Sequence, residues 1–174
     1  MNKQINNQDQ LFIVKRDGRK EQLDISKVHK MTQAACEGLT GVSSSQVEMN
    51  SGLQFVDNMT TQDIQEVLIK SANDLITLEA PNYQYVASRL LLFTIRKEVF
   101  GKHIDHQYQV PLQFLVGRNV EKGLYDPKIM QWYNDEEFKT LDSYIKHDRD
   151  YNFTYAGLRQ VADKYLVQDR SSGK

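Results

Sequence analysis

Apolar residues recur at helical spacing between residues 60 and 76, and this pattern predicts an amphipathic helix. Thr60 with Asp63, just before the stripe, is suited to cap this helix. The apolar positions are Ile64, Val67, Leu68, Ala72, Leu75 and Ile76. One amphipathic helix cannot bury its own apolar face, so the fold must supply other elements that cover it.

Three more helices are predicted around this one. Asp24 is suited to cap the first of them, and Ser43 with Gln46 has the spacing of a capping box that opens the second. Pro81 suits the first turn of a longer helix that runs to about Val99 and is apolar on more than one side. The apolar positions of the first are Val28, Met31, Ala35 and Leu39.

A β-hairpin is predicted before the helices, over roughly residues 11–24. The apolar run LFIV leads into Asp17-Gly18, a dipeptide typical of a type I′ turn. The expected fold class is therefore mainly α, with an N-terminal hairpin and a four-helix bundle followed by an all-helical segment. Residues 1–10 are expected to be a disordered tail, 11–101 the hairpin and bundle, and 102–174 the helical segment.

Composition excludes several classes of function. The 174 residues carry 22 Lys and Arg against 23 Asp and Glu, so no basic excess favours nucleic acid. We see no apolar run long enough to cross a membrane and no secretory signal, which makes the cytoplasm the expected location. The single cysteine, Cys36, cannot form an internal disulfide, and His103-x-x-His106 is too sparse for a metal site. No catalytic motif is present, so we expect no catalytic and no metal-binding residues.

Three places in the sequence could hold an anion, although each also has a purely structural explanation. Lys15 and Arg16 belong to a basic hairpin whose charges could simply be solvated. The helix opened by Thr60 and Thr61 has free amide groups, but capping alone explains its sequence. Lys97 lies near the end of the long helix, where a favourable interaction with the helix dipole would be enough to explain it.

The order of these pieces resembles the ATP-cone, a small regulatory nucleotide-binding domain. The matching features are VKRDG at 14–18, Glu21, Asp24 to Lys27, Thr61-x-Asp63-Ile64 and PNYQYVASRLLLFTIRK at 81–97. Further segments resemble the N-terminal part of the class I ribonucleotide reductase large (alpha) subunit. These are AAxEGL at 34–39, GLYD at 123–126, HDRD at 147–150, FTYAG at 153–157 and KYLVQDR at 164–170.

The resemblance implies an overall-activity site at which ATP activates and dATP inhibits the reduction of ribonucleoside diphosphates, with Mg²⁺ expected beside the phosphates. It implies that Lys15, Thr61 and Lys97 contact the phosphates, with Arg16 nearby. Glu21 and Asp24 would contact the base, and Lys27 would make a further contact to the nucleotide. Ile64 and Phe93 would form apolar walls. The implied partners are the small (beta) subunit and other alpha subunits. The chain would be an N-terminal piece, with 102–174 leading to an absent catalytic barrel.

Two departures from the family pattern concern how ATP and dATP are distinguished. Gln65 stands where many relatives have His, and Asp24 stands where relatives often have Asn. The sequence has two alternative interpretations. The ATP-cone transcriptional repressor needs a four-cysteine zinc ribbon that this chain lacks. The second is a degenerate cone that acts as a protein-interaction module without binding nucleotide.

Overall fold

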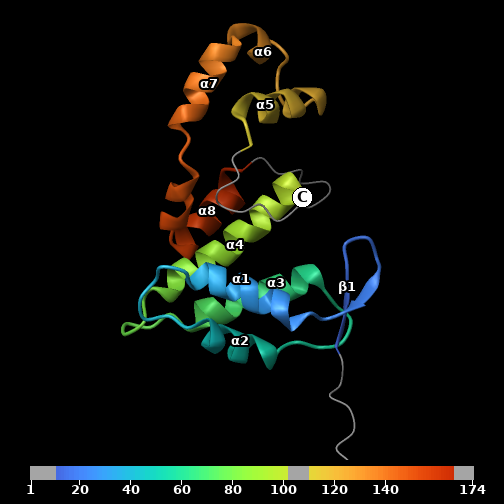
Figure 1. Ribbon diagram of the computed structural model, residues 1–174, viewed down its shortest axis with the longest axis vertical. Helices are drawn as coiled ribbons and strands as arrows, with labels where there is room; N and C mark the ends of the chain where they lie inside the picture. The colour runs from blue at the N-terminus through green and yellow to red at the C-terminus, as the bar shows by residue number, and fades with distance from the viewer. Residues whose placement is uncertain (1–10, 102–109, 167–174) are drawn as a thin grey trace, which may run out of the picture.

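The computed structural model describes residues 11–101 and 110–166, and its regular structure is mainly helical (Figure 1). The expected tail at 1–10, the first eight residues of the expected helical segment and the end of the KYLVQDR segment lie outside these residues. Within them, no helix is long and apolar enough to cross a membrane. The mainly α prediction is confirmed.

Three short strands form one small sheet in the order β2-β1-β3. β1 (Phe12–Val14) pairs antiparallel with β2 (Lys20–Gln22), which confirms the predicted hairpin. β3 (Met59–Thr60) pairs parallel with β1 and was not predicted. This pairing attaches the start of the following helix to the hairpin.

The predicted type I′ turn is wrong. Gly18 has φ 81°, whereas Asp17 is not among the residues with positive φ, and a type I′ turn needs both. The Gly18 amide donates to the Lys15 carbonyl at 2.9 Å, and the Lys15 amide donates to the Arg19 carbonyl at 2.8 Å. This is a three-residue loop with glycine in the left-handed position, a common alternative for hairpins.

Four helices follow the hairpin and pack into one bundle (Figure 1). Asp24 caps the first and Thr60 caps the third, as predicted, and Thr60 and Asp63 form a complete capping box. They are α1 (Ile25–Cys36), α2 (Ser44–Gly52), α3 (Thr61–Asp74) and α4 (Tyr83–Phe100).

Three local predictions need correction. Ser43 caps α2, but the Gln46 side chain accepts a hydrogen bond from the Tyr83 hydroxyl instead of closing a capping box. Pro81 lies before α4 rather than in its first turn, because Asn82 is the N-cap. Ile76 lies beyond the end of α3 and is 37% exposed, so it does not continue the apolar stripe.

The core is centred on α4, which packs against α1, α3 and a helix near the C-terminus. Val86 and Leu90 are fully buried on α4, and Leu68 of α3 is fully buried beside them in the same core. Buried residues occur around most of the circumference of α4, which confirms the prediction that it is buried on more than one side.

After residue 110 all regular elements of the described chain are helical. The helices α5 to α7 lie beyond the C-terminal end of α4, while η1 and α8 return to pack against α4 (Figure 1). Their bounds are α5 (Leu112–Glu121), α6 (Ile129–Trp132), α7 (Asp135–Tyr144), the 3₁₀ helix η1 (His147–Asn152) and α8 (Tyr155–Lys164). The short α6 and η1 were not predicted as separate elements.

An ion pair fastens η1 to α4. Arg96 is buried on α4, and its Nη2 donates to Asp150 Oδ2 at 2.8 Å. The guanidinium groups of Arg89 and Arg96 lie 5.0 and 5.6 Å from the centre of the Tyr151 ring, within cation–π range. The return of the chain onto α4 therefore depends on polar as well as apolar contacts.

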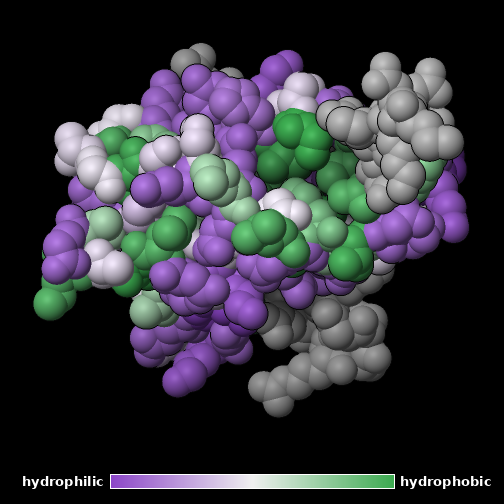
Figure 2. Space-filling model, turned by 90° about the horizontal axis from the view of Figure 1, so that it is seen from below, coloured by the Kyte–Doolittle hydropathy of each residue, from purple (hydrophilic) through white to green (hydrophobic). Residues whose placement is uncertain are grey.

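Figure 2 shows the end of the molecule that carries α2, where apolar groups are separated by polar ones. Met49, Leu53 and Val56 are exposed apolar residues of α2 and the loop after it.

Candidate functional site

The hairpin, α1, α3 and the end of α4 line a cavity of about 410 Å³. Its polar lining comes from seven side chains on these four elements: Lys15, Glu21, Asp24, Lys27, Lys30, Thr61 and Lys97, with Gln65 beside them. Its apolar lining is Ile13, Leu23, Val28, Met31, Ala34 and Ile64. A cavity with an apolar part and several convergent polar groups is the usual form of a small-molecule site.

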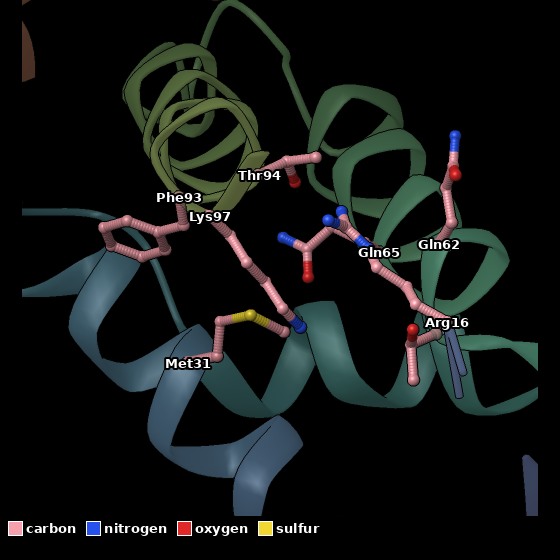
Figure 3. Close-up of a pocket in the computed structure, with 8 residues that line it drawn as sticks. Arg16, Met31, Gln62, Gln65, Phe93, Thr94 and Lys97 are labelled. Carbon is pink, nitrogen blue, oxygen red and sulfur yellow. The ribbon is translucent and has the colours of Figure 1, made fainter. Parts of the chain in front are cut away.

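A smaller cavity of about 60 Å³ adjoins the first (Figure 3). The two have four lining residues in common, so they share walls: Met31, Thr61, Gln65 and Lys97. Arg16 and Phe93 line only the smaller one. All nine predicted site residues therefore line one or the other cavity, seven of them the larger.

The parallel pairing of β1 with β3 explains why hairpin and α3 meet at this cavity. Val14 is in register with Thr60, so their neighbours Lys15 and Thr61 are brought to the same place. Thr60 Oγ1 accepts from the Asp63 amide at 3.0 Å, and Asp63 Oδ2 accepts from the Thr60 amide at 2.9 Å. This capping box fixes the first turn of α3 where it faces the cavity.

Two carboxylates lie among the lysines. Glu21 Oε1 is 2.7 Å from Lys15 Nζ and 3.8 Å from Lys27 Nζ. The hydrogen bond from Lys15 holds the pKa of Glu21 below its ordinary value. Glu21 therefore stays ionised at neutral pH and can only accept hydrogen bonds.

Asp24 has a structural task in addition to lining the cavity. Its Oδ1 accepts from the Ser26 hydroxyl at 2.6 Å and from the Ser26 amide at 3.0 Å, which makes it the N-cap of α1. These bonds, led by the hydroxyl, lower the pKa of Asp24. Its other oxygen, Oδ2, lies 3.7 Å from Lys27 Nζ.

Lys97 brings positive charge from the end of α4. Burial lowers the pKa of its ammonium group, and the nearby charges of Arg16 and Lys15 lower it further. Arg16 Nη2 lies 3.6 Å from Glu98 Oε1 on the same turn of α4. Three cations from two elements thus gather at one end of the cavities, an arrangement that an anion would stabilise.

Gln65 presents an acceptor to the cavities. Its Nε2 donates to the Leu90 carbonyl of α4 at 3.0 Å, and in Figure 3 its Oε1 points toward the space occupied by Lys97. Gln62 points away from that space. The amide of Gln65 is therefore fixed by α4 and leaves an oxygen for a ligand.

Lys30 and Met31 are among the lining residues that sequence reasoning missed. Lys30 lines the larger cavity one turn after Lys27, and the Lys27-x-x-Lys30 spacing on α1 could have indicated it. Met31 lines both cavities, although the apolar pattern assigned it only to the core.

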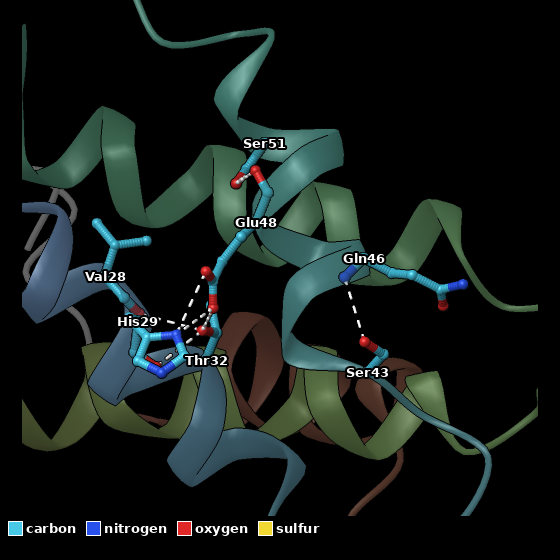
Figure 4. A network of polar contacts seen from close by, with 7 residues as sticks. All are labelled: Val28, His29, Thr32, Ser43, Gln46, Glu48 and Ser51. Carbon is cyan, nitrogen blue, oxygen red and sulfur yellow. Dashed lines mark hydrogen bonds and ion pairs between the residues drawn. The ribbon is translucent and has the colours of Figure 1, made fainter.

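A second polar network holds α1 to α2, and its side chains His29, Thr32 and Glu48 line neither cavity (Figure 4). His29 Nδ1 lies 3.1 Å from Glu48 Oε1, and the Thr32 hydroxyl donates to the same oxygen at 2.5 Å. Over the described part of the chain, no group of three or more His, Cys, Asp or Glu could hold a metal ion. His103 and His106 lie outside those residues.

Comparison with known proteins gives matches over most of the chain. The model of the ATP cone domain family matches residues 11–98. The chain is 47% identical to ribonucleoside-diphosphate reductase 1 subunit alpha of Salmonella typhimurium and 45% identical to that of Escherichia coli, each over 165 residues. It is 40% identical over 162 residues to ribonucleoside-diphosphate reductase subunit alpha of Enterobacteria phage T4.

These matches cover 93–94% of the chain but 21% of each relative. The chain thus spans about a fifth of the length of the curated relatives it matches.

Proposed function

Because the chain belongs to the ATP-cone family, we propose that it binds ATP or dATP in the larger cavity and thereby regulates a ribonucleotide reductase. In this proposal ATP is the activating effector and dATP the inhibiting one, and the regulated reaction is the reduction of ribonucleoside diphosphates in the cytoplasm. The role is that of an overall-activity site rather than of a catalytic centre.

The observation that carries this proposal is the mixed lining of the larger cavity. Four lysines, against two carboxylates, come from the hairpin, α1 and α4, and the remaining wall is largely apolar. A phosphate chain needs the cations, while an adenine ring needs apolar surface and a few acceptors. A nucleotide has both features, and the lining of this cavity provides for both.

The proposed contacts follow the chemistry of each group. Lys15, Thr61 and Lys97 hold phosphates, with Arg16 beside them in the adjoining cavity, and Lys27 is a further contact to the nucleotide. The hydroxyl and first-turn amides at Thr61 suit an anion at the start of a 14-residue helix.

The base would lie toward the carboxylates. Glu21 and Asp24 are both ionised, so they can accept hydrogen bonds from the adenine amino group. Ile64 and Phe93, each 6% exposed, supply apolar walls. Gln65 and Asp24, which depart from the family pattern, set how strongly ATP and dATP are discriminated.

Mg²⁺ would enter with the nucleotide rather than bind the chain. The lysines around the cavity repel a free divalent cation, and the two carboxylates there are already paired with lysines. Magnesium commonly binds nucleotides through phosphate oxygens and water. The phosphates, not Glu21 or Asp24, are therefore the proposed ligands.

The proposed partners are the small subunit of the reductase and other alpha subunits. The relatives are alpha subunits of ribonucleoside-diphosphate reductase, and the matched region is a fifth of their length. Catalysis is therefore assigned to other parts of such a subunit. Nucleotide binding at the cone would bias which subunits associate, and a coupling of about 1–3 kcal/mol would suffice for this.

One observation favours the alternative of a cone that binds no nucleotide. Lys15 is already paired with Glu21, and Asp24 already caps α1, so both have structural roles without a ligand. Such a domain would act as a protein-interaction module.

Calorimetric titration with ATP and with dATP, each with Mg²⁺, distinguishes these functions. The proposal expects binding of both nucleotides, dATP more tightly than ATP, and at least tenfold weaker binding by a Lys15→Ala variant. Lys70→Ala is the matched control, because Lys70 is an exposed lysine of α3 that lines neither cavity. Absence of heat with either nucleotide, in a sample shown to be folded by circular dichroism, would support the interaction module instead.

A further inference from the structure

Lys30 is a cavity lysine that neither the sequence motifs nor the proposed contacts assign. It lies on α1 one turn after Lys27, and it lines the larger cavity on the same wall as Ala34. Lys15 and Lys97 line it from other elements, the hairpin and α4. A ligand in this cavity therefore meets cations from three elements.

The lysines differ in how far they are already neutralised. Lys15 is paired with Glu21 at 2.7 Å, and Lys27 lies between Glu21 and Asp24 at 3.8 and 3.7 Å. Lys30 makes no hydrogen bond or ion pair with any residue of 11–101 or 110–166. Its side chain is exposed on the surface of the helix.

This difference matters for a polyanionic ligand. A lysine that already has a carboxylate partner must share or break that ion pair when it contacts a phosphate. Lys30 has no such partner within the described chain, so a phosphate contact costs it only part of its hydration and side-chain freedom. Its flexible stem also allows the ammonium group to follow a phosphate along the cavity.

We propose that Lys30 contacts the phosphate chain of the bound nucleotide and contributes to the preference for a triphosphate over a nucleotide with fewer phosphates. This inference rests on the proposed function, since it concerns the same cavity. It adds a specificity-determining residue on α1 to the phosphate contacts from the hairpin, α3 and α4.

The test compares ATP, ADP and AMP by calorimetric titration of the full chain. The variants are Lys30→Ala, Lys30→Arg, which keeps the charge, and Lys70→Ala as the control lysine outside the cavities. We expect Lys30→Ala to weaken ATP binding about tenfold, as for loss of a hydrogen bond to a charged group, and to weaken AMP binding less. Lys30→Arg should stay within about threefold of wild type, and Lys70→Ala should not differ from it.

A second readout separates charge from structure. Because salt screens exposed charges, the dependence of ATP affinity on ionic strength should be shallower in Lys30→Ala than in wild type. Equal losses for ATP and AMP, or an unchanged salt dependence, would overturn the inference while leaving the nucleotide function intact. Wild-type protein that binds no ATP would instead overturn the proposed function and this inference with it.

Discussion

Replacing Asp150 by Ala should destabilise the protein more than any exposed charge substitution, because it leaves Arg96 buried without its carboxylate. The Arg96 side chain is 9% exposed and that of Asp150 is 33% exposed, and their atoms are 2.8 Å apart. Removing one partner of a fully buried pair costs about 3–5 kcal/mol. Since Asp150 is one-third exposed, water can partly replace it, and we expect a loss of about 2–3 kcal/mol.

Thermal denaturation followed by circular dichroism measures this loss. For a chain of this length, each kcal/mol lowers Tm by about 2–4 °C, so Asp150→Ala should melt about 4–12 °C below wild type. Glu136→Ala is the control, because the Lys139–Glu136 pair is exposed and should contribute less than about 1 kcal/mol.

A double variant tests the cause. Adding Arg96→Met to Asp150→Ala removes the uncompensated charge, so the double variant should be more stable than Asp150→Ala alone. An Asp150→Ala protein within about 0.5 kcal/mol of wild type would refute the reasoning, as would a double variant in which the two losses simply add.

Three further predictions concern single groups. The hydrogen bonds from Thr60 lower the pKa of Asp63, so the Asp63 carboxylate stabilises the protein at neutral pH and this stabilisation is lost as the pH falls from about 4 through the folded pKa. The urea midpoint should therefore fall less steeply between pH 7 and pH 3 in an Asp63→Asn variant than in wild type. The pKa of Lys97, which is lowered in the free protein, should rise when a phosphate pairs with its ammonium group, so the protein should take up a proton when it binds ATP at alkaline pH. This uptake is measured as a binding enthalpy that depends on the ionisation enthalpy of the buffer, and Lys97→Met should abolish the dependence. Gly18→Ala should cost about 1–2 kcal/mol, although open space surrounds the site, because φ there is 81°; an unchanged urea midpoint would contradict this.

Helix positions could be predicted well because their signals are local. Asp24, Ser43 and Thr60 each cap the helix that they were expected to cap, since an N-cap depends on residues only two or three positions away. The end of α3 was less predictable. Ile76 fits the apolar period, yet the helix stops at Asp74 and the chain turns toward α4.

Strand β3 could not be predicted, because its two residues carry no strand signal of their own. Met59 and Thr60 become a strand only where the hairpin offers an edge for pairing. The turn at Asp17-Gly18 differs from the predicted type I′ turn for a similar reason. The dipeptide suits several hairpin loops, and the backbone pairing of Lys15 with Arg19 selects one of them.

The candidate site was predictable only in part from the residues themselves. Lys15, Thr61 and Lys97 each had an ordinary structural explanation, and their convergence depends on tertiary packing that no local pattern encodes. The resemblance to the ATP-cone family predicted that these three residues contact the same phosphates. It did not predict a role for Lys30, which was recognised as a cavity residue only because the structure shows that α1 lines the cavity.

The parallel pairing of β1 with β3 also has a consequence for the order in which the protein folds. The Phe12 amide donates to Asp57 Oδ1, a contact between residues 45 positions apart, whereas β1 and β2 meet through a local hairpin. Contacts between residues this far apart in the sequence form late, because the chain loses the entropy of closing a long loop before the contacts stabilise it. The hairpin and single helices can therefore appear early, but Lys15 and Thr61 do not face one cavity until the sheet is complete. A growing chain would acquire its binding site only after Lys97 has been synthesised and β3 has docked.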